Sequence, residues 1–253
     1  MDPATKLRFD SPLLRIYDDG RVERFFGTET TAPGFDADTG VTSKDVVIDS
    51  ATGVFVRLYI PADLPATEQK KLPILVHFHG GCLVLDSATS PMYHRYLNSV
   101  VSKATVLAVS VNYRLAPEHP VPAGYEDSWS AFVWAASGAD PWLSEHGDAS
   151  RIFLAGDSGG GIIVHNIAMM AGSRHGLDDP WLNPMADGAP SLQKLACRKL
   201  LVCLAERDFS RARAAAYYQA VKESGWPGSV EWVDSKGEEH VFFLHKPECD
   251  ASD

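Results

Sequence analysis

Apolar and polar residues follow two different patterns along the chain, and the pattern changes near Pro73. Between residues 12 and 60 they alternate on both sides of short polar turns. The stretch LLRIYDDGRVERFF turns at residues 18–20, and DVVIDSATGVFVRLYIP turns at residues 51–53. Alternation with a period of two around a glycine turn is typical of β-hairpins. This part of the chain is therefore predicted to form antiparallel hairpins.

Continuous apolar runs replace the alternation after Pro73. The runs are ILVHFHG, TVLAVSVNY, RIFLAGDS and KLLVCLAE. Helix-like stretches follow them, such as YEDSWSAFVWAAS after the second and RARAAAYYQAVKESG after the fourth. Buried strands alternating with helices indicate an α/β fold with a mostly parallel sheet flanked by helices. Such sheets bind ligands at the carboxyl ends of their strands, so we expect the functional residues there.

Length and composition limit the class of protein. A chain of 253 residues with 45% hydrophobic and 22% charged residues can form one large globular domain, predicted here over residues 1–253. It has no apolar run of about 18 residues, so no membrane span is expected. The net charge of −10 argues against a nucleic-acid partner. Acidity alone selects no substrate, and nothing in the sequence indicates an oligomeric state.

Cysteine usage and the first residues point to a cytoplasmic location. The stretch MDPATKLRFDSPLLRIY has no apolar core of the kind that secretory signals carry. The four cysteines are irregularly spaced, which favours reduced thiols over a disulfide framework. They are Cys82, Cys197, Cys203 and Cys249.

Glycines surround Ser158 in the stretch RIFLAGDSGGGIIVHN, where a predicted strand turns into a predicted helix. A sharp corner of this kind needs a positive φ at the corner residue and no Cβ on its close neighbours. GDSGG matches G-x-S-x-G, the nucleophile elbow, which exposes its serine above the sheet. We therefore predict a nucleophile at Ser158. A glycine-rich turn that binds phosphate is the alternative reading.

A serine nucleophile needs a base that is oriented by an acid, and in this architecture the order along the chain is Ser, acid, His. Asp208 closes the strand KLLVCLAERD, and His240 follows the strand SVEWVDSKGEE. We select Asp208 as the acid and His240 as the base. The alternative for His240 is an ordinary histidine on a surface loop. The competing residues are His165, His175 and His245 among the histidines, and Glu206, Asp234, Glu238 and Glu239 among the acids.

The stretch HFHGGCLVLD supplies candidate oxyanion donors directly after a strand. Backbone N–H groups of Gly80, Gly81, Cys82 and Gly159 are predicted to surround the oxyanion, although a simple tight turn is the plainer reading. The neighbouring histidines of this strand share one face, but two ligands without a third are weak support for a metal. No metal site and no cofactor are predicted.

Several motifs together resemble the plant carboxylesterase family, the hormone-sensitive-lipase-like α/β hydrolases that include gibberellin receptors and 2-hydroxyisoflavanone dehydratases. The motifs are HFHGGC, VNYRLAPEHPVPAGYEDS, GDSGGG, DDPWLNP and GEEHVFF, and the similarity extends from IYDDGRVERF onward. The resemblance implies an eight-stranded, mostly parallel sheet, with an N-terminal cap segment in residues 1–45 and a catalytic core in 72–245. It further implies a triad of Ser158, Asp208 and His240, an oxyanion hole in the HGG stretch, and a supporting role for YRLAPEHPVPAGYED.

The sequence departs from the family pattern in two motifs. The family reads HGGGF where this chain has a cysteine at position 82, so a positive φ there strains the oxyanion hole. The family reads GDSAG where this chain has Gly159, a change that keeps the N–H group.

The sequence is also short between its predicted site residues. Only 50 positions separate Ser158 from Asp208, where the family has a further strand and cap helices. We predict that an internal strand is missing where Arg174 runs into Asp178, and that the 13 residues after His240 leave no room for a closing helix. A sheet that lacks an inner strand has to re-pair or open a gap. A shortened form with reduced stability and weak activity is the expectation.

The predicted function is hydrolysis of small carboxylic esters by a plant serine esterase. One alternative is a non-catalytic, hormone-like binding protein, in which the histidine position is altered whereas His240 is present here. Another is an isoflavanone dehydratase, for which a threonine at position 158 is the family feature, and a third is an inactive shortened isoform. Candidate pocket walls, with core packing as the plainer role of each, are Leu83, Tyr113, Trp181 and Phe242.

Overall fold

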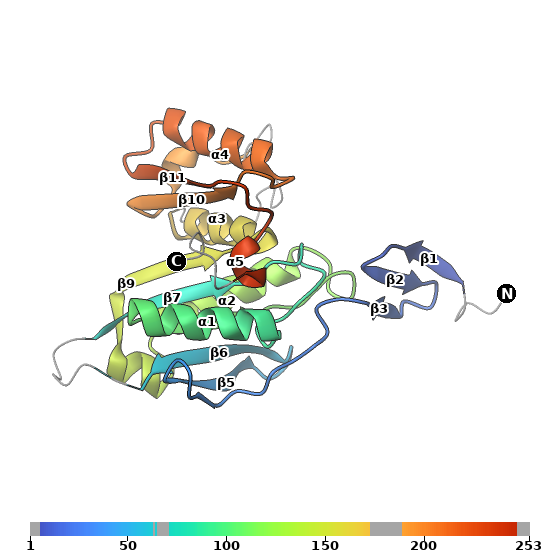
Figure 1. The fold of residues 1–253 in the computed structure, drawn as a ribbon, viewed down its shortest axis with the longest axis horizontal. Coiled ribbons are helices and arrows are strands. Elements are labelled where there is room, and N and C mark those ends of the chain that lie inside the picture. Colours follow the sequence, from blue (N-terminus) through green and yellow to red (C-terminus); the bar gives the residue numbers. More distant parts are fainter. Residues whose placement is uncertain (1–5, 63, 65–70, 173–188, 247–253) are drawn as a thin grey trace. The chain divides into compact units, whose positions relative to one another are not determined.

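A computed structural model describes residues 6–62, 64, 71–172 and 189–246 of the chain. The chain divides into two compact units, Met1–Ile163 and Val164–Asp253. Figure 1 shows the elements of both units along the chain.

A six-stranded sheet organises the first unit, in the order β4-β5-β6-β8-β7-β9. Its strands are β4 (Phe35–Asp36), β5 (Val41–Asp49), β6 (Val54–Pro61), β7 (Leu72–Phe78), β8 (Leu107–Asn112) and β9 (Gly147–Gly156). The pairs from β4 to β8 are antiparallel, whereas β7 runs parallel to both β8 and β9. The hairpin predicted around residues 51–53 is confirmed as β5 and β6, and the parallel part begins with the apolar run after Pro73, as predicted.

Two helices of the first unit pack on this sheet. They are α1 (Pro91–Ala104), which contacts β5, β6 and β8, and α2 (Ala123–Ala136), which contacts β6, β7 and β8. Helix α1 starts with a proline, whose missing N–H costs nothing at that position, and stops where Thr105 adopts a left-handed φ of 52°. Its apolar side chains join the core beside β8, whose first five residues are fully buried. Burial on both faces explains why four of these five residues are apolar.

The N-terminal part forms a separate antiparallel sheet of β1 (Leu7–Asp10), β2 (Leu14–Tyr17) and β3 (Val22–Arg24). The turn predicted at residues 18–20 joins β2 and β3. Arg24 ties β3 to the rest of the first unit, because its guanidinium donates to both carboxylate oxygens of Glu118 at 2.6 Å and to the carbonyl of Val84 at 2.6 Å. The segment predicted as a cap therefore consists of this small sheet, β4 and the first residues of β5.

Strand β9 leads directly into α3 (Gly159–Gly172), as the glycine-rich stretch predicts. A turn of π-helix, Trp142–His146, precedes the strand. Among the described residues β9 pairs with β7 only.

The second unit contains a parallel pair of strands with one crossover helix. Its elements are a 3-10 turn (Leu192–Lys194), β10 (Lys199–Ala205), α4 (Arg211–Glu223), β11 (Ser229–Ser235) and the short helix α5 (Phe242–His245). Strands β10 and β11 pair in parallel over seven residues, and α4 packs on both. The strand and the helix predicted for KLLVCLAE and RARAAAYYQAVKESG are thus confirmed. Residues 173–188, where the internal deletion is predicted, lie outside the described part.

No helix in the described part of the chain is long and apolar enough to cross a membrane.

Candidate active site

Ser158 occupies a strained corner between β9 and α3. Its φ is +50°, a left-handed value that side chains other than glycine rarely adopt. The neighbouring glycines permit the corner: a Cβ on Gly156 would lie 2.5 Å from the backbone of Gly160, and a Cβ on Gly160 would overlap the carbonyl oxygen of Phe78. Two backbone bonds close the turn, from Gly160 N to Asp157 O at 2.7 Å and from Gly161 N to Ser158 O at 3.1 Å. The predicted elbow geometry is therefore present.

Asp208 and His240 form a hydrogen-bonded pair in the second unit. Nδ1 of His240 lies 2.8 Å from Oδ2 of Asp208. A carboxylate only accepts, so Nδ1 carries the proton and Nε2 is the nitrogen available to a substrate or nucleophile. The other carboxylate oxygen accepts from the backbone N and the hydroxyl of Ser210, both at 2.7 Å. Burial raises the pKa of Asp208, but the hydrogen bonds from His240 and Ser210 outweigh it and leave the pKa below its usual value.

Backbone strain also follows His240. Val241 has a φ of +48°, and a β-branched residue with positive φ is an outlier that persists only when its surroundings hold it. The exposed ring of Phe209 lies beside the imidazole, with the centroids 4.6 Å apart. The imidazole of His240 therefore contacts both the Asp208 carboxylate and the Phe209 ring.

Three of the four competing acids, Glu206, Asp234 and Glu238, are engaged elsewhere. Glu206 accepts from the backbone N of Gly237 at 2.8 Å. Asp234 receives both prongs of the Arg211 guanidinium, at 2.6 and 2.9 Å. Glu238 pairs with Lys246 at 3.0 Å. Within the described part of the chain, Asp208 is the acid that is hydrogen-bonded to His240.

The competing histidines also differ from His240. His165 lies within α3 and its Nδ1 is 2.9 Å from the hydroxyl of Tyr217. Burial lowers the pKa of His165 to about 4. His245 is exposed in α5, and His175 lies outside the described residues. Ser158 belongs to the first unit, and the Asp208–His240 pair belongs to the second.

The HGG loop, residues 79–83, has an unusual backbone. Gly81, Cys82 and Leu83 have φ values of +85°, +54° and +60°. Two of these residues carry side chains, so the loop is strained in the way predicted for a cysteine at position 82. The loop touches the elbow, because a Cβ on Gly159 would lie 3.0 Å from both N and Cα of Cys82.

The backbone N–H groups of the HGG loop differ in whether they already have a hydrogen-bond partner. Gly80 donates to the hydroxyl oxygen of Tyr93 at 2.8 Å. The N–H groups of Gly81, Cys82 and Gly159 have no hydrogen-bond partner among the described residues. Three backbone donors are therefore available, two in the HGG loop and one in the residue after Ser158.

The stretch YRLAPEHPVPAGYED supports this loop. Tyr113 donates its hydroxyl proton to the carbonyl of His79 at 2.7 Å, and its ring stacks on the imidazole with the centroids 4.2 Å apart. The backbone N of Ala116 donates to the carbonyl of Leu83 at 2.8 Å. Farther along, both carboxylate oxygens of Asp127 accept from Arg114 at 2.8 Å, which holds the stretch to α2. These contacts agree with the supporting role that the family resemblance implies.

The histidines of β7 and the loop are neutral and structural. Burial lowers the pKa of His77 to about 3 and that of His79 to about 4. Both imidazoles are almost fully enclosed and pack against Tyr93. In the part of the chain that the structure describes, no three His, Cys, Asp or Glu side chains are grouped so that they could hold a metal ion.

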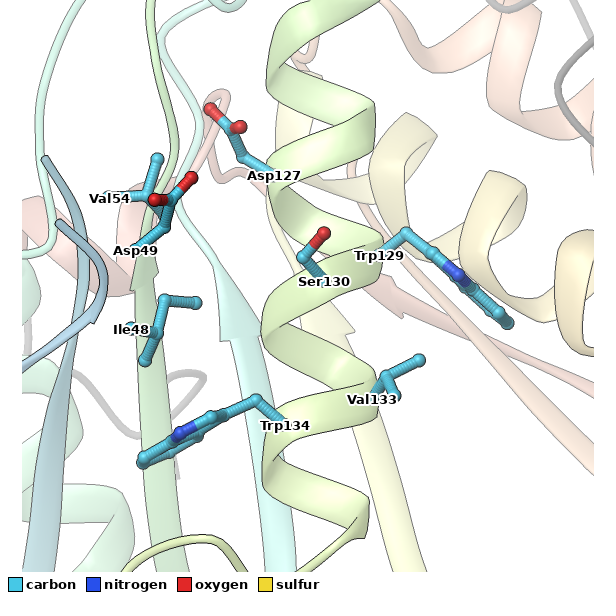
Figure 2. Close-up of a pocket in the computed structure, with 8 residues that line it drawn as sticks. All are labelled: Ile48, Asp49, Val54, Asp127, Trp129, Ser130, Val133 and Trp134. Carbon is cyan, nitrogen blue, oxygen red and sulfur yellow. The ribbon is translucent and has the colours of Figure 1, made fainter. Parts of the chain in front are cut away.

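The predicted pocket walls are mostly core residues. Leu83, Tyr113 and Phe242 are all buried, and Trp181 lies outside the described residues. A cavity of about 370 Å³ instead lies beside α2 and the turn between β5 and β6 (Figure 2). It is lined by Ile48, Asp49, Val54, Asp127, Trp129, Ser130, Val133 and Trp134. None of the predicted site residues lines it, so this cavity is not the predicted active site.

Sequence reasoning missed two residues of this region, Tyr93 and Asp157. Tyr93 lies in the first turn of α1 and contacts the HGG loop, and Asp157 directly precedes Ser158. The position of Asp157 within the GDSGG motif was the one available indication. Nothing in the sequence pattern around Tyr93 distinguishes it from an ordinary core tyrosine.

Comparison with known proteins identifies the family. The family model for the α/β-hydrolase fold matches residues 75–177 and 173–244. The chain is 41% identical over 300 positions to 2-hydroxyisoflavanone dehydratase of Glycyrrhiza echinata, covering 95% of this chain and 91% of the relative. It is 37% identical over 287 positions to probable carboxylesterase 2 of Arabidopsis thaliana, with the same coverage of both chains. The esterase of Pyrobaculum calidifontis matches with a TM-score of 0.67 and 26% identity over 83% of this chain and 80% of that one. The chain therefore belongs to the plant carboxylesterase family of α/β hydrolases.

The matches also bear on the predicted deletion. The two matched pieces of the family model meet at residues 173–177, where the internal strand is predicted to be missing. The alignment with the Glycyrrhiza echinata relative extends over more positions than this chain has residues, so the relative contains segments that this chain lacks. The fold is an α/β-hydrolase fold in a shortened form.

Proposed function

We propose that this protein hydrolyses carboxylic esters of small molecules with Ser158, His240 and Asp208 as its catalytic triad. The observation that carries the proposal is the 2.8 Å hydrogen bond between His240 and Asp208, because it orients a general base of the type that a serine nucleophile requires. The strained corner at Ser158 supplies the second requirement, a partly buried serine directly before the start of a helix. We further propose that residues 1–253 act as one domain, with a cap in 1–45 and the catalytic core in 72–245.

The chemistry follows from the roles of these groups. Oγ of Ser158 attacks the ester carbonyl while Nε2 of His240 accepts the hydroxyl proton. The C–O bond to the alcohol breaks, and His240 returns the proton to the leaving alkoxide. Water then attacks the acyl-serine with His240 again as the base, which releases the carboxylic acid and restores the serine. Asp208 holds the imidazole and stabilises its protonated form. The reaction needs no metal or organic cofactor.

The negative charge on the substrate oxygen is stabilised by backbone N–H groups. We assign this role to Gly81, Cys82 and Gly159, whose N–H groups have no other partner in the described part of the chain. Gly80, also expected in this set, donates to Tyr93 and is assigned to holding the loop instead. The N-terminal end of α3 adds a favourable dipole beside Gly159.

A second candidate activity is dehydration of an isoflavanone, favoured by the 41% identity to the relative of that name. Dehydration uses the oxyanion donors and the base but requires no acyl-serine. The two activities therefore differ in their dependence on Ser158.

A cytoplasmic location stays a prediction from the sequence.

Release of p-nitrophenol from p-nitrophenyl acetate tests the proposal. The variant Ser158→Ala is expected to lose at least about 1000-fold in kcat. Ser130→Ala, which changes an exposed serine on α2, is the matched control and should keep the wild-type rate. Equal turnover by the wild type and Ser158→Ala would overturn the esterase. In that case, 2-hydroxyisoflavanone turnover would identify a dehydratase, and thermal shifts with small acids would identify a binding protein.

A further inference from the structure

The HGG loop needs an external support, because its backbone is strained at consecutive residues. A residue with a side chain pays roughly 1–2 kcal/mol to adopt the left-handed conformation, and Cys82 and Leu83 both do so. Such a backbone persists only where its surroundings impose it. The N–H groups that we assign to the oxyanion lie in this strained segment.

The hydroxyl of Tyr93 links the loop to the nucleophile elbow. It lies 2.8 Å from Oδ2 of Asp157 and 2.8 Å from the backbone N of Gly80. The Asp157 carboxylate can only accept, so the tyrosine proton points to it, and the tyrosine oxygen is left to accept from Gly80. The direction of both bonds is therefore determined.

Burial makes this link rigid. Tyr93 is 1% exposed and Asp157 is 8% exposed. The loop backbone approaches the pair closely, since a Cβ on Gly80 would lie 3.0 Å from the hydroxyl of Tyr93 and would overlap the Asp157 carboxylate. Burial and the neighbouring carboxylate also raise the pKa of Tyr93 far above its usual value, so the hydroxyl keeps its proton. Charge-assisted hydrogen bonds of this kind are stronger than neutral ones.

We propose that Tyr93, oriented by Asp157, is a positioning residue that sets the distance between the oxyanion donors and Ser158. Asp157 is the residue before Ser158, and Gly80 is the residue before Gly81. The two hydrogen bonds of the Tyr93 hydroxyl therefore connect the backbone beside the nucleophile to the backbone that carries the oxyanion donors. This inference rests on the proposed esterase function. It assigns a task to a side chain that touches neither substrate nor triad.

The variant Tyr93→Phe tests the proposal, because it removes only the linking oxygen. We expect kcat for p-nitrophenyl acetate to fall about 10- to 100-fold with KM within about twofold, since displaced donors weaken transition-state binding more than ground-state binding. Affinity for a trifluoromethyl ketone, which forms a tetrahedral adduct with the serine, should fall by a similar factor. The number of competent sites is counted with an organophosphate that labels Ser158, so that kcat refers to folded protein.

Tyr59→Phe is the matched control. Tyr59 is fully buried, and its hydroxyl lies 3.1 Å from Nδ1 of His94, the residue after Tyr93. Among the described residues it makes no hydrogen bond to the HGG loop. The control loses a buried tyrosine hydroxyl and a comparable amount of stability, but kcat per site should be unchanged. A wild-type kcat in Tyr93→Phe would overturn the positioning role, and so would an equal loss in both variants.

A second variant decides the matter if Tyr93→Phe does not fold. Asp157→Asn keeps the shape but replaces the charged acceptor by a neutral amide, and we expect kcat per site to fall at least about threefold. An unchanged kcat in Asp157→Asn would then overturn the proposal. Failure of the esterase itself is separately visible, because the wild type and Ser158→Ala would then turn over at the same rate.

Discussion

Gly159 packs directly against the backbone of Cys82, with only 3.0 Å between an ideal Cβ at position 159 and the N and Cα atoms of Cys82. Both residues depart from the family motifs, which have alanine after the serine and a third glycine in the HGG stretch. The structure places the two departures in contact. The smaller residue after Ser158 leaves space beside a loop that carries an additional side chain.

Replacing the cysteine by the family residue should stabilise the protein. Cys82→Gly removes a side chain from a backbone with a φ of +54°, and we expect the free energy of unfolding to rise by about 1 kcal/mol. The N–H group is kept, so kcat should be unchanged or higher. Urea unfolding followed by circular dichroism measures the effect. Cys203→Ala, at another exposed cysteine, should show no such gain.

Replacing the glycine by the family residue should do the opposite in this background. Gly159→Ala introduces a Cβ that the backbone at position 82 must accommodate, and we expect a loss of about 1 kcal/mol together with lower kcat. The loss should be smaller when Cys82→Gly is present, because glycine lets the loop move. A double-mutant cycle measures this coupling. Strict additivity of the two changes would refute the contact as their cause.

The acid of the triad can be tested against a matched acid on the neighbouring strand. Asp208→Asn should lower kcat about 100- to 10,000-fold, because the amide no longer holds the productive tautomer of His240. Asp234→Asn removes a partly exposed carboxylate bonded to Arg211, and it should change kcat less than twofold. Steady-state turnover of p-nitrophenyl acetate compares them. A larger loss of kcat in Asp234→Asn than in Asp208→Asn would show that Asp208 is not the acid of the triad.

Acid should destabilise the second unit through His165. Burial lowers the pKa of this histidine from 6.5 to about 4, so the unfolded chain takes up its proton before the folded chain does. The contribution of neutral His165 to the free energy of unfolding is therefore fully present above pH 6.5. It is lost as the pH drops toward 4, by at most about 3 kcal/mol. His165→Gln should lose less stability across this pH range than the wild type, whereas the exposed His245→Gln should behave like the wild type. Urea titrations at pH 7 and pH 4.5 provide the comparison.

The shortened core should reduce both stability and turnover. Strand β9 has one partner within the described part of the chain, and its Phe153 side chain is 57% exposed. An apolar face left uncovered forfeits about 25 cal/mol per Å². We expect calorimetry to show a broad, weakly cooperative transition and kcat to lie well below that of full-length plant carboxylesterases. A single sharp transition with ordinary esterase turnover would contradict this expectation.

Local patterns were sufficient to predict most of the elements. The alternation before Pro73 and the apolar runs after it identified the β5–β6 hairpin and the strands β7 to β10, because side-chain periodicity reflects which faces a strand buries. The glycines around Ser158 predicted a strained corner for the same local reason, as only glycine fits where backbones approach so closely. Helix α1 was not singled out, since its apolar positions are mixed with polar ones that make long-range contacts, such as Asn98 with Asp36.

The sequence by itself determined the class of fold, the elbow at Ser158 and the order of the candidate residues, because these depend on residue type and spacing along the chain. Tertiary structure decided which acid orients His240 and which N–H of the HGG loop is already taken. Asp208, Glu206 and Asp234 look alike in a sequence, and Tyr93 looks like any core tyrosine. Hydrogen bonds between residues 13 to 64 positions apart depend on how strands and helices pack, and the local pattern carries no record of that packing.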